Sequence, residues 1–202
     1  MYASIIPYCL ALITTFAFLP ESNEPILRNA KNVTIVIKND SYLKILGTTN
    51  VNTFSCGYVG KIAADTLSIH MQWEEDRILL NDAVLEVEVA RFDCGQSVMN
   101  KDFRKLLQYE EFPDLKINIL SLMISSQTHY EALAKVSIKI AGKEGVYEVP
   151  VRRDEDKEEQ YYTGRQAINI RDFSLEPPKK FLGMVEVDEE VVIDFRLNLS
   201  LL

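Results

Sequence analysis

The chain has 202 residues, which is enough for one substantial hydrophobic core and short for two. Its 47% hydrophobic and 26% charged residues are typical of a globular domain and exclude a collagen-like or low-complexity chain. Acidic residues number 30 and basic residues 22, giving a net charge of -8. This charge disfavours non-specific binding to nucleic acid or to an anionic membrane, so no nucleic-acid partner is expected.

The N-terminus has the features of a secretion signal over residues 1–22, which leaves residues 23–202 as a single domain. The first twenty residues carry no charged side chain. The apolar run from Ile5 to Leu19 has the length of a signal-peptide core rather than of a membrane-spanning helix. No Lys or Arg precedes this run and no clear Ala-x-Ala site follows it, so an uncleaved anchor is the alternative. We expect a secreted mature chain without an integral membrane span.

Removal of the signal would leave two cysteines, Cys56 and Cys94, because Cys9 lies inside the signal. An even number of cysteines in an oxidising compartment predicts a disulfide. The bridge would close a loop of about forty residues and stabilise the fold by roughly 3 to 4 kcal/mol. Two buried free thiols are the alternative.

From residue 30 onward, apolar and polar residues alternate with the period of two that is typical of strands. The segments with the clearest alternation carry, on their apolar faces, Val87 and Val89 (84–92), Val136 and Ile138 (133–141), and Phe195 and Leu197 (191–202). Further strands are predicted at 33–38, 42–58, 67–73, 115–124, 146–151 and 166–171. One apolar face per strand indicates antiparallel strands with a single buried side.

One short helix is predicted at about 99–108, after the break at Gly95. Asn100 is the expected N-cap, Phe103 lies on the apolar face, and Pro113 ends the segment. A helix this short needs the strands for stability, so it is expected to cover one end of them. An antiparallel eight-stranded barrel with the helix near its mouth accounts for both features. The interior of such a barrel is either filled by side chains or wide enough for one small ligand, and the pattern allows both.

The search for catalytic chemistry favours a non-enzymatic protein. The two histidines, His70 and His129, have no cysteine or histidine cluster around them, so no metal site is expected. Glu110 and Glu111 beside Asp114 are the one acidic group that resembles a glycosidase pair, and acidic residues at such a junction are usually solvated. No protein-bound cofactor is predicted.

Residues 152–160, RRDEDKEEQ, form a charged run between two predicted strands and are interpreted as a solvated hairpin loop. If the core is solid, the alternative function is a non-enzymatic interaction module that acts through this acidic loop. Whether the chain forms a homodimer stays open at this point.

Three stretches, in order, resemble the YceI-like proteins: LGTTNVNTFSCGYVG (46–60), DCGQSVMNKDFRKLLQYEEFPDLKI (93–117) and INIRDFSLEPPKKFLGMVEVDEEVVIDFRLNL (168–199). The resemblance covers roughly residues 35–200. The chain departs from the family pattern at Asn52, where a histidine is common, and in the length of the 152–160 run.

The resemblance implies a lipocalin-like barrel with an apolar tunnel for a polyisoprenoid lipid or an isoprenoid quinone, no catalytic activity, and a periplasmic or secreted location in a Gram-negative-type bacterium. By position in the matching motifs, Val51, Phe54, Met99 and Phe103 are expected to line the tunnel. The alternation described above adds Val87, Val89, Val136, Ile138, Phe195 and Leu197.

Overall fold

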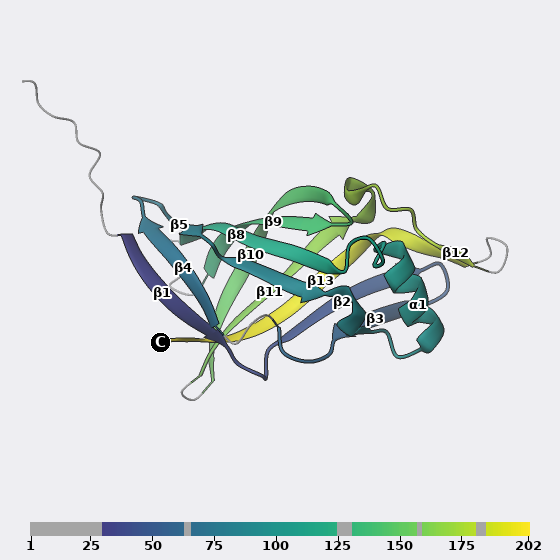
Figure 1. Cartoon of the computed structure of the whole chain (residues 1–202), viewed down its shortest axis with the longest axis horizontal. Helices are drawn as coiled ribbons and strands as arrows, with labels where there is room; N and C mark the ends of the chain where they lie inside the picture. The colour runs from purple at the N-terminus through teal and green to yellow at the C-terminus, as the bar shows by residue number, and fades with distance from the viewer. Residues whose placement is uncertain (1–29, 63–65, 125–130, 157–158, 181–184) are drawn as a thin grey trace, which may run out of the picture.

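The computed structural model describes residues 30–62, 66–124, 131–156, 159–180 and 185–202, so the expected signal at 1–22 lies outside the described residues. This part of the chain forms thirteen strands, the helix α1 (Ser97–Leu106) and two 3-10 helices, η1 (Val89–Arg91) and η2 (Ile170–Phe173) (Figure 1). The strands are β1 (Ala30–Ile37), β2 (Tyr42–Thr49), β3 (Thr53–Tyr58), β4 (Thr66–Trp73), β5 (Arg77–Asn81), β6 (Val84–Glu88), β7 (Phe92–Asp93), β8 (Asp114–Ile124), β9 (Glu131–Ile140), β10 (Lys143–Asp156), β11 (Glu159–Asn169), β12 (Lys179–Lys180) and β13 (Val185–Leu201).

Eight of these strands pair into a closed ring. In order around the ring they are β1, β4, β5, β8, β9, β10, β11 and β13, and the pairing of β13 with β1 closes it. Every pairing in the ring is antiparallel. The predicted all-β class and the eight-stranded antiparallel, lipocalin-like arrangement are therefore confirmed.

Strand β13 is long enough to have two partners along the same side. Its residues 187–196 pair with β2, and its residues 199–201 pair with β1. Strands β3 and β7 continue the sheet beyond β2. The molecule is consequently elongated, with the β2–β3 extension and α1 at the right of Figure 1 and the start of β1 at the left.

The structure corrects several strand boundaries. The long strand predicted at 42–58 is two strands, because the Thr49 hydroxyl accepts hydrogen bonds from the backbone N–H groups of Val51 and Asn52 and folds the chain into a turn. The strand β5 was not predicted. The strand predicted at 84–92 ends at Glu88 and continues as η1.

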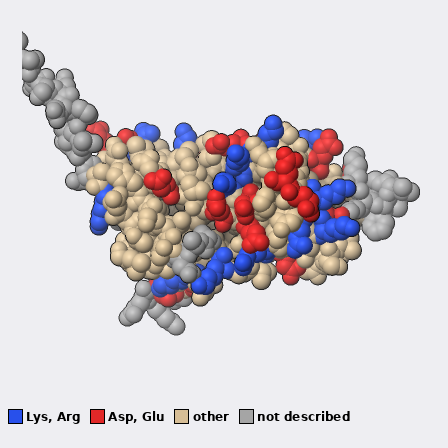
Figure 2. Space-filling model, in the orientation of Figure 1, with Lys and Arg blue, Asp and Glu red and all other residues tan. Residues whose placement is uncertain are grey.

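The interpretation of 152–160 as a loop was wrong in extent. Strands β10 and β11 continue through most of it, with the ladder running from Val151 opposite Gly164 to Asp156 opposite Glu159. On the face seen in Figure 2, acidic and basic side chains are interspersed rather than gathered by sign.

The α1 end of the molecule is solid. Met99, Phe103 and Leu106 of the helix pack against the main core, and the Phe103 ring lies 5.2 Å from the ring of Phe92, which is only 2% exposed. The helix begins close to its predicted position, but Asn100 is not its N-cap. That position belongs to Gln96, which makes no side-chain capping hydrogen bond.

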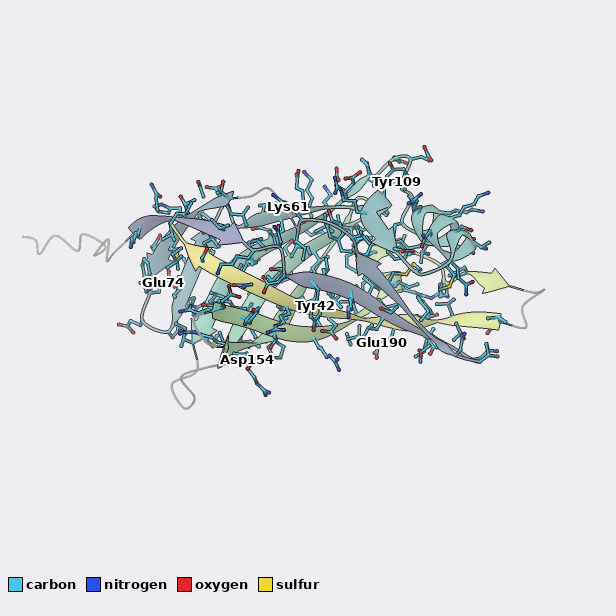
Figure 3. All side chains as sticks on the ribbon, turned by 90° about the horizontal axis from the view of Figure 1, so that it is seen from below. Tyr42, Lys61, Glu74, Tyr109, Asp154 and Glu190 are labelled. Atoms are coloured by element: carbon cyan, nitrogen blue, oxygen red, sulfur yellow. A yellow bond between two sulfur atoms is a disulfide. The ribbon has the colours of Figure 1, made fainter. Side chains whose placement is uncertain are left out.

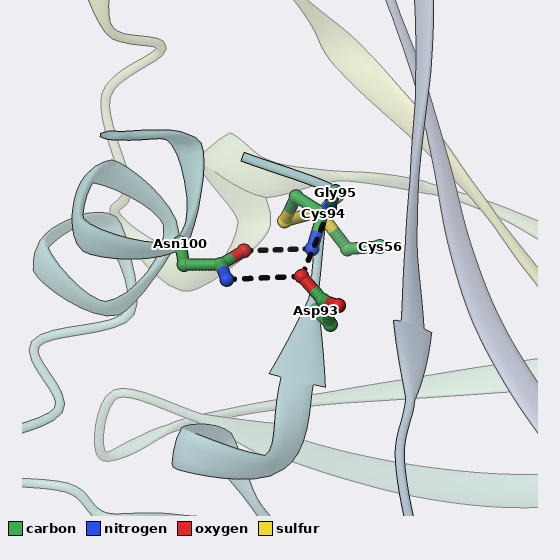
Figure 4. The surroundings of a disulfide bond; sticks show 5 residues. All are labelled: Cys56, Asp93, Cys94, Gly95 and Asn100. Atoms are coloured by element: carbon green, nitrogen blue, oxygen red, sulfur yellow. Dashed lines mark hydrogen bonds between the residues drawn. A yellow bond between two sulfur atoms is a disulfide. The ribbon is translucent and has the colours of Figure 1, made fainter. Parts of the chain in front are cut away.

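Asn100 instead ties the helix to the neighbouring disulfide (Figure 4). Its side-chain Oδ1 accepts a hydrogen bond from the Cys94 backbone N–H at 2.7 Å, and its Nδ2 donates to Asp93 at 3.0 Å. Cys94 is joined to Cys56 of β3 by a disulfide bond. The bridge lies beside the short ladder in which Gly57 pairs with Asp93, so it fastens the β2–β3 extension to the segment that leads into α1.

A polar cluster holds the place where β13 changes partner. Asn198, which is fully buried, donates from Nδ2 to the carboxylates of Asp40 at 2.9 Å and Glu159 at 2.6 Å. The Tyr161 hydroxyl lies 2.8 Å and 2.7 Å from the same two carboxylates, and Lys38 pairs with Glu159 at 3.0 Å. This cluster of five residues links the β1–β2 connection to β11 and β13.

The cluster favours the ionised form of both carboxyl groups. Burial raises the pKa of Asp40, but the hydrogen bonds from Asn198 and Tyr161 outweigh burial, and the net pKa is below its usual value. Hydrogen bonds from Tyr161, Lys38 and Asn198 lower the pKa of Glu159. The hydrogen bond to Glu159, together with the one to Asp40, raises the pKa of the Tyr161 hydroxyl, so the phenol stays protonated.

We predict that replacing both Cys56 and Cys94 by Ser lowers the free energy of unfolding by about 4 kcal/mol, because the closed loop of 38 residues no longer restricts the unfolded chain. Urea unfolding of the variant and of the oxidised wild type measures the difference. The wild type in excess reductant is the control and should lose a similar amount. Equal stability of the oxidised and reduced wild type would contradict the prediction.

We also predict that Asn198→Asp destabilises the protein at pH 7, since a third carboxylate then replaces the amide that donates to Asp40 and Glu159. The pKa values of Asp40 and Glu159 are lowered by folding. Their stabilising contribution is therefore present above the unfolded pKa of about 4 and is lost as the pH falls through the folded pKa. The deficit of the variant relative to wild type should thus shrink as the pH is lowered from neutral to about 3.

The matched control is Asn39→Asp, which adds the same charge one residue before Asp40, at an exposed position. Urea unfolding at several pH values should show a small effect for this control and a large, pH-dependent one for Asn198→Asp. A deficit that stays constant over the pH range would show that the carboxylates are not the cause.

Candidate ligand cavity

A cavity of about 650 Å³ lies inside the ring of strands. Alternation along β13 supplies one wall of it, with Ile193, Phe195, Leu197, Leu199 and Leu201 facing inward. Between them, Asp194, Arg196 and Asn198 lie on the outer side, where Asp194 pairs with Arg165 at 2.8 Å. Most of the remaining wall is aliphatic, with residues from β1, β4, β6, β8, β9 and β10.

The exposed and charged residues of the lining indicate that the cavity opens where β13 ends and β11 begins. Leu201 at the end of β13 is 72% exposed, and Glu159 is the first residue of β11. Lys38 and Glu159 form the ion pair of the polar cluster described above, whereas Lys31 lies on the exposed rim. The mouth is thus polar at its rim and apolar immediately inside.

Five of the ten residues predicted to line a tunnel do line this cavity: Val87, Val136, Ile138, Phe195 and Leu197. Each was assigned from strand alternation. The five that the structure does not place in the lining are Val51, Phe54, Val89, Met99 and Phe103.

Four of those five lie in the solid end, or in the turn beside it. Val51 is 67% exposed in the β2–β3 turn, and Phe54 covers Gly47, where a Cβ atom would come within 2.3 Å of its ring. Met99 and Phe103 belong to α1 and pack on the core. The two motifs that supplied these residues therefore build the β2–β3 extension and its helix rather than the cavity wall.

The prediction that Val89 lines the tunnel is wrong for a different reason. The strand that carries Val87 ends at Glu88, and η1 turns Val89 into the core, where it is completely buried. Strict alternation does not apply beyond the end of a strand.

No α1 residue lines the cavity. The helix lies at the end of the molecule opposite the start of β1 (Figure 1). In Figure 3, Glu74 of the β4–β5 connection lies near the left end, and Tyr109, just after α1, lies in the right half of the molecule. The helix lies at this end because its Phe103 packs on Phe92, which belongs to β7, a strand outside the ring.

Several lining residues were missed. Trp73 extends the inward face of β4 beyond Ile69 and Met71, and its alternation with these residues would have found it. Gln166 on β11 also lines the cavity; alternation with Ile168 puts it on the inward face, where a polar residue is not expected.

The groups considered for catalysis are not brought together. His70 Nδ1 lies 2.8 Å from the Asn32 side chain, and Glu110 and Glu111 are exposed. The described residues contain no group of three or more His, Cys, Asp or Glu side chains placed to hold a metal ion. His129 lies outside the described residues. None of the helices in the described ranges is long and apolar enough to cross a membrane.

No protein-family model matches the chain, and no curated protein matches it. Several solved structures, in contrast, match the chain. BcnA of Burkholderia cenocepacia is 18% identical with a TM-score of 0.57, and the match covers 81% of this chain and 99% of that protein. A polyisoprenoid-binding domain from Saccharophagus degradans, implicated in plant cell wall breakdown, is 12% identical with a TM-score of 0.58, covering 82% of this chain and 97% of that domain.

A third, weaker match is the YceI protein of Campylobacter jejuni, at 9% identity and a TM-score of 0.46, with 68% of this chain and 82% of that one covered. At sequence identities this low, the comparisons show a shared fold and carry no conclusion about function. The chain therefore has the fold of BcnA and of the Saccharophagus polyisoprenoid-binding domain, as the resemblance to the YceI-like proteins predicted.

Proposed function

We propose that the protein is a non-enzymatic binding protein for a long apolar lipid, which it holds inside the barrel. The preferred ligand class is an isoprenoid, either a polyprenyl lipid or an isoprenoid quinone. The protein acts in the periplasm or outside the cell, as a carrier or a store of that lipid.

The observation that carries the proposal is the interior cavity. Its volume of about 650 Å³ falls within the range of roughly 300 to 1,000 Å³ that is usual for ligand sites. Its wall is aliphatic and aromatic, so the main driving force for binding is removal of apolar surface from water, worth about 0.8 kcal/mol per buried CH₂ group. A long hydrocarbon chain uses that driving force along its whole length.

The isoprenoid class is supported by the shared fold, since the Saccharophagus domain is described as polyisoprenoid-binding. The location is supported by the disulfide between Cys56 and Cys94, because such bonds persist in oxidising compartments. The signal-like residues 1–22 point the same way.

The alternative, an interaction module with a solid core, is less well supported. Its two premises were a filled interior and a long acidic loop at 152–160. The interior contains the cavity, and most of that run belongs to the β10–β11 ladder.

The first test is native mass spectrometry of the protein purified from its own periplasmic or secreted fraction, followed by organic extraction. An adduct with the mass of an isoprenoid lipid is the expected result. A protein that carries no lipid and also fails to take up added polyprenols would contradict the proposal.

We predict that Phe195→Glu reduces the amount of co-purifying lipid by more than tenfold. Phe195 lines the cavity, and a carboxylate there would have to be buried against the lipid chain without a partner. Lipid extracted per mole of protein measures the effect, and far-UV circular dichroism checks that the variant keeps its β structure.

Ala167→Glu is the matched control, because it adds the same charge on neighbouring β11 at an exposed outward position. It should keep the lipid content of the wild type. If both variants lose the lipid equally, or neither does, the inward assignment of Phe195 is incorrect.

A further inference from the structure

Strand β11 differs from the other strands of the cavity wall in the chemistry of its inward side. It contributes Gln160, Tyr162 and Gln166, with Gly164 between the last two. Gly164 has no side chain because the Phe195 ring occupies that space, where a Cβ atom would come within 2.5 Å. Apart from residues at the rim, the other strands line the cavity with apolar side chains. Gln166 is therefore a polar group inside an otherwise apolar part of the cavity.

Gln166 lies at the closed end. It pairs with Ile193, the lining residue of β13 that is farthest from the mouth. The next inward pair, Ile168 and Val191, is buried in the core and no longer lines the cavity. Gln160 lies near the rim, six residues earlier in the same strand, or about 20 Å away at the usual rise of a strand.

The hydrogen-bonding capacity of Gln166 is only partly used. Its Nε2 donates to the carbonyl oxygen of Ala167 at 2.8 Å. Within the described ranges of the chain, its Oε1 accepts no hydrogen bond from the protein. The side chain is partly exposed and belongs to the lining of the cavity. Its Oε1 is therefore an acceptor at the cavity wall that can receive a hydrogen bond from a ligand.

A purely apolar chain end at this position would remove water from Oε1 without replacing its hydrogen bond, which is unfavourable. A charged group is also disfavoured, since the lysines of the lining, Lys31 and Lys38, are both at the rim. A neutral group with an O–H donor can give Oε1 a hydrogen bond without placing a charge inside the cavity.

We propose that the lipid enters head first and that its neutral hydroxyl group donates a hydrogen bond to Gln166 Oε1, with the apolar chain extending towards the mouth. This inference rests on the proposed function and narrows the ligand class to long-chain isoprenoid alcohols. The same geometry makes Gln166 the residue that distinguishes an alcohol from its ether or hydrocarbon analogue.

The test compares geranylgeraniol with geranylgeranyl methyl ether, which has the same chain but no O–H donor. Trp73 is the single tryptophan of the chain and lines the cavity, so its fluorescence reports the binding of either lipid. The wild type should bind the alcohol about tenfold more tightly than the ether. Gln166→Leu should remove this preference and bind the ether at least as well as the wild type does.

Gln160→Leu is the control at the rim and should keep the preference for the alcohol. Gln166→Met provides a second, unbranched apolar replacement in case the leucine variant folds poorly. A preference that survives in Gln166→Leu and Gln166→Met, or that disappears in Gln160→Leu, overturns the head-first orientation. Failure of both lipids to change Trp73 fluorescence in the wild type would instead overturn the proposed function itself.

Discussion

The structure depends on the pairing of the last strand with the first. Strand β13 brings residues 199–201 alongside β1 after pairing with β2 over 187–196, and this switch closes the ring. Closure satisfies the backbone groups of both edge strands, which would otherwise be open to pairing with other chains. It also encloses the apolar faces of eight strands, so the cavity exists because β1 pairs with β13.

The switch leaves a corner where β1 departs from β13, and the polar cluster around Asn198 occupies it. The buried amide of Asn198 donates to both carboxylates, Lys38 pairs with Glu159, and the single hydrogen of the Tyr161 hydroxyl is shared between Asp40 and Glu159. The cluster lies next to the cavity mouth, since Lys38 and Glu159 belong to both. Barrel closure and the polar rim of the proposed site are therefore built from the same side chains.

The molecule has one half with a packed core and one half that encloses the cavity. In the solid half, Phe92 packs against Phe103 of α1, Phe173 of η2 is buried in the same core, and the disulfide fastens β3 to the segment that leads into α1. In the hollow half, the inward side chains leave a cavity of about 650 Å³. An eight-stranded barrel is near the size at which side chains alone just fill it, so the choice of residues on each strand decides whether a cavity remains.

By itself, the sequence determined most of the strands, the single helix and the two sides of each regular strand. The period of two placed Val87, Val136, Ile138, Phe195 and Leu197 on inward faces, because side-chain direction within a strand is a local property of the backbone. It did not determine which inward residues face a cavity and which face a packed core. Val51, Met99 and Phe103 were assigned to the tunnel, yet they lie at the opposite end, since strand pairing between distant segments decides what each face meets. Gln166 shows the same limit: alternation places it on the same face of β11 as the buried Ile168, but only the closed ring shows that this part of the face meets a cavity.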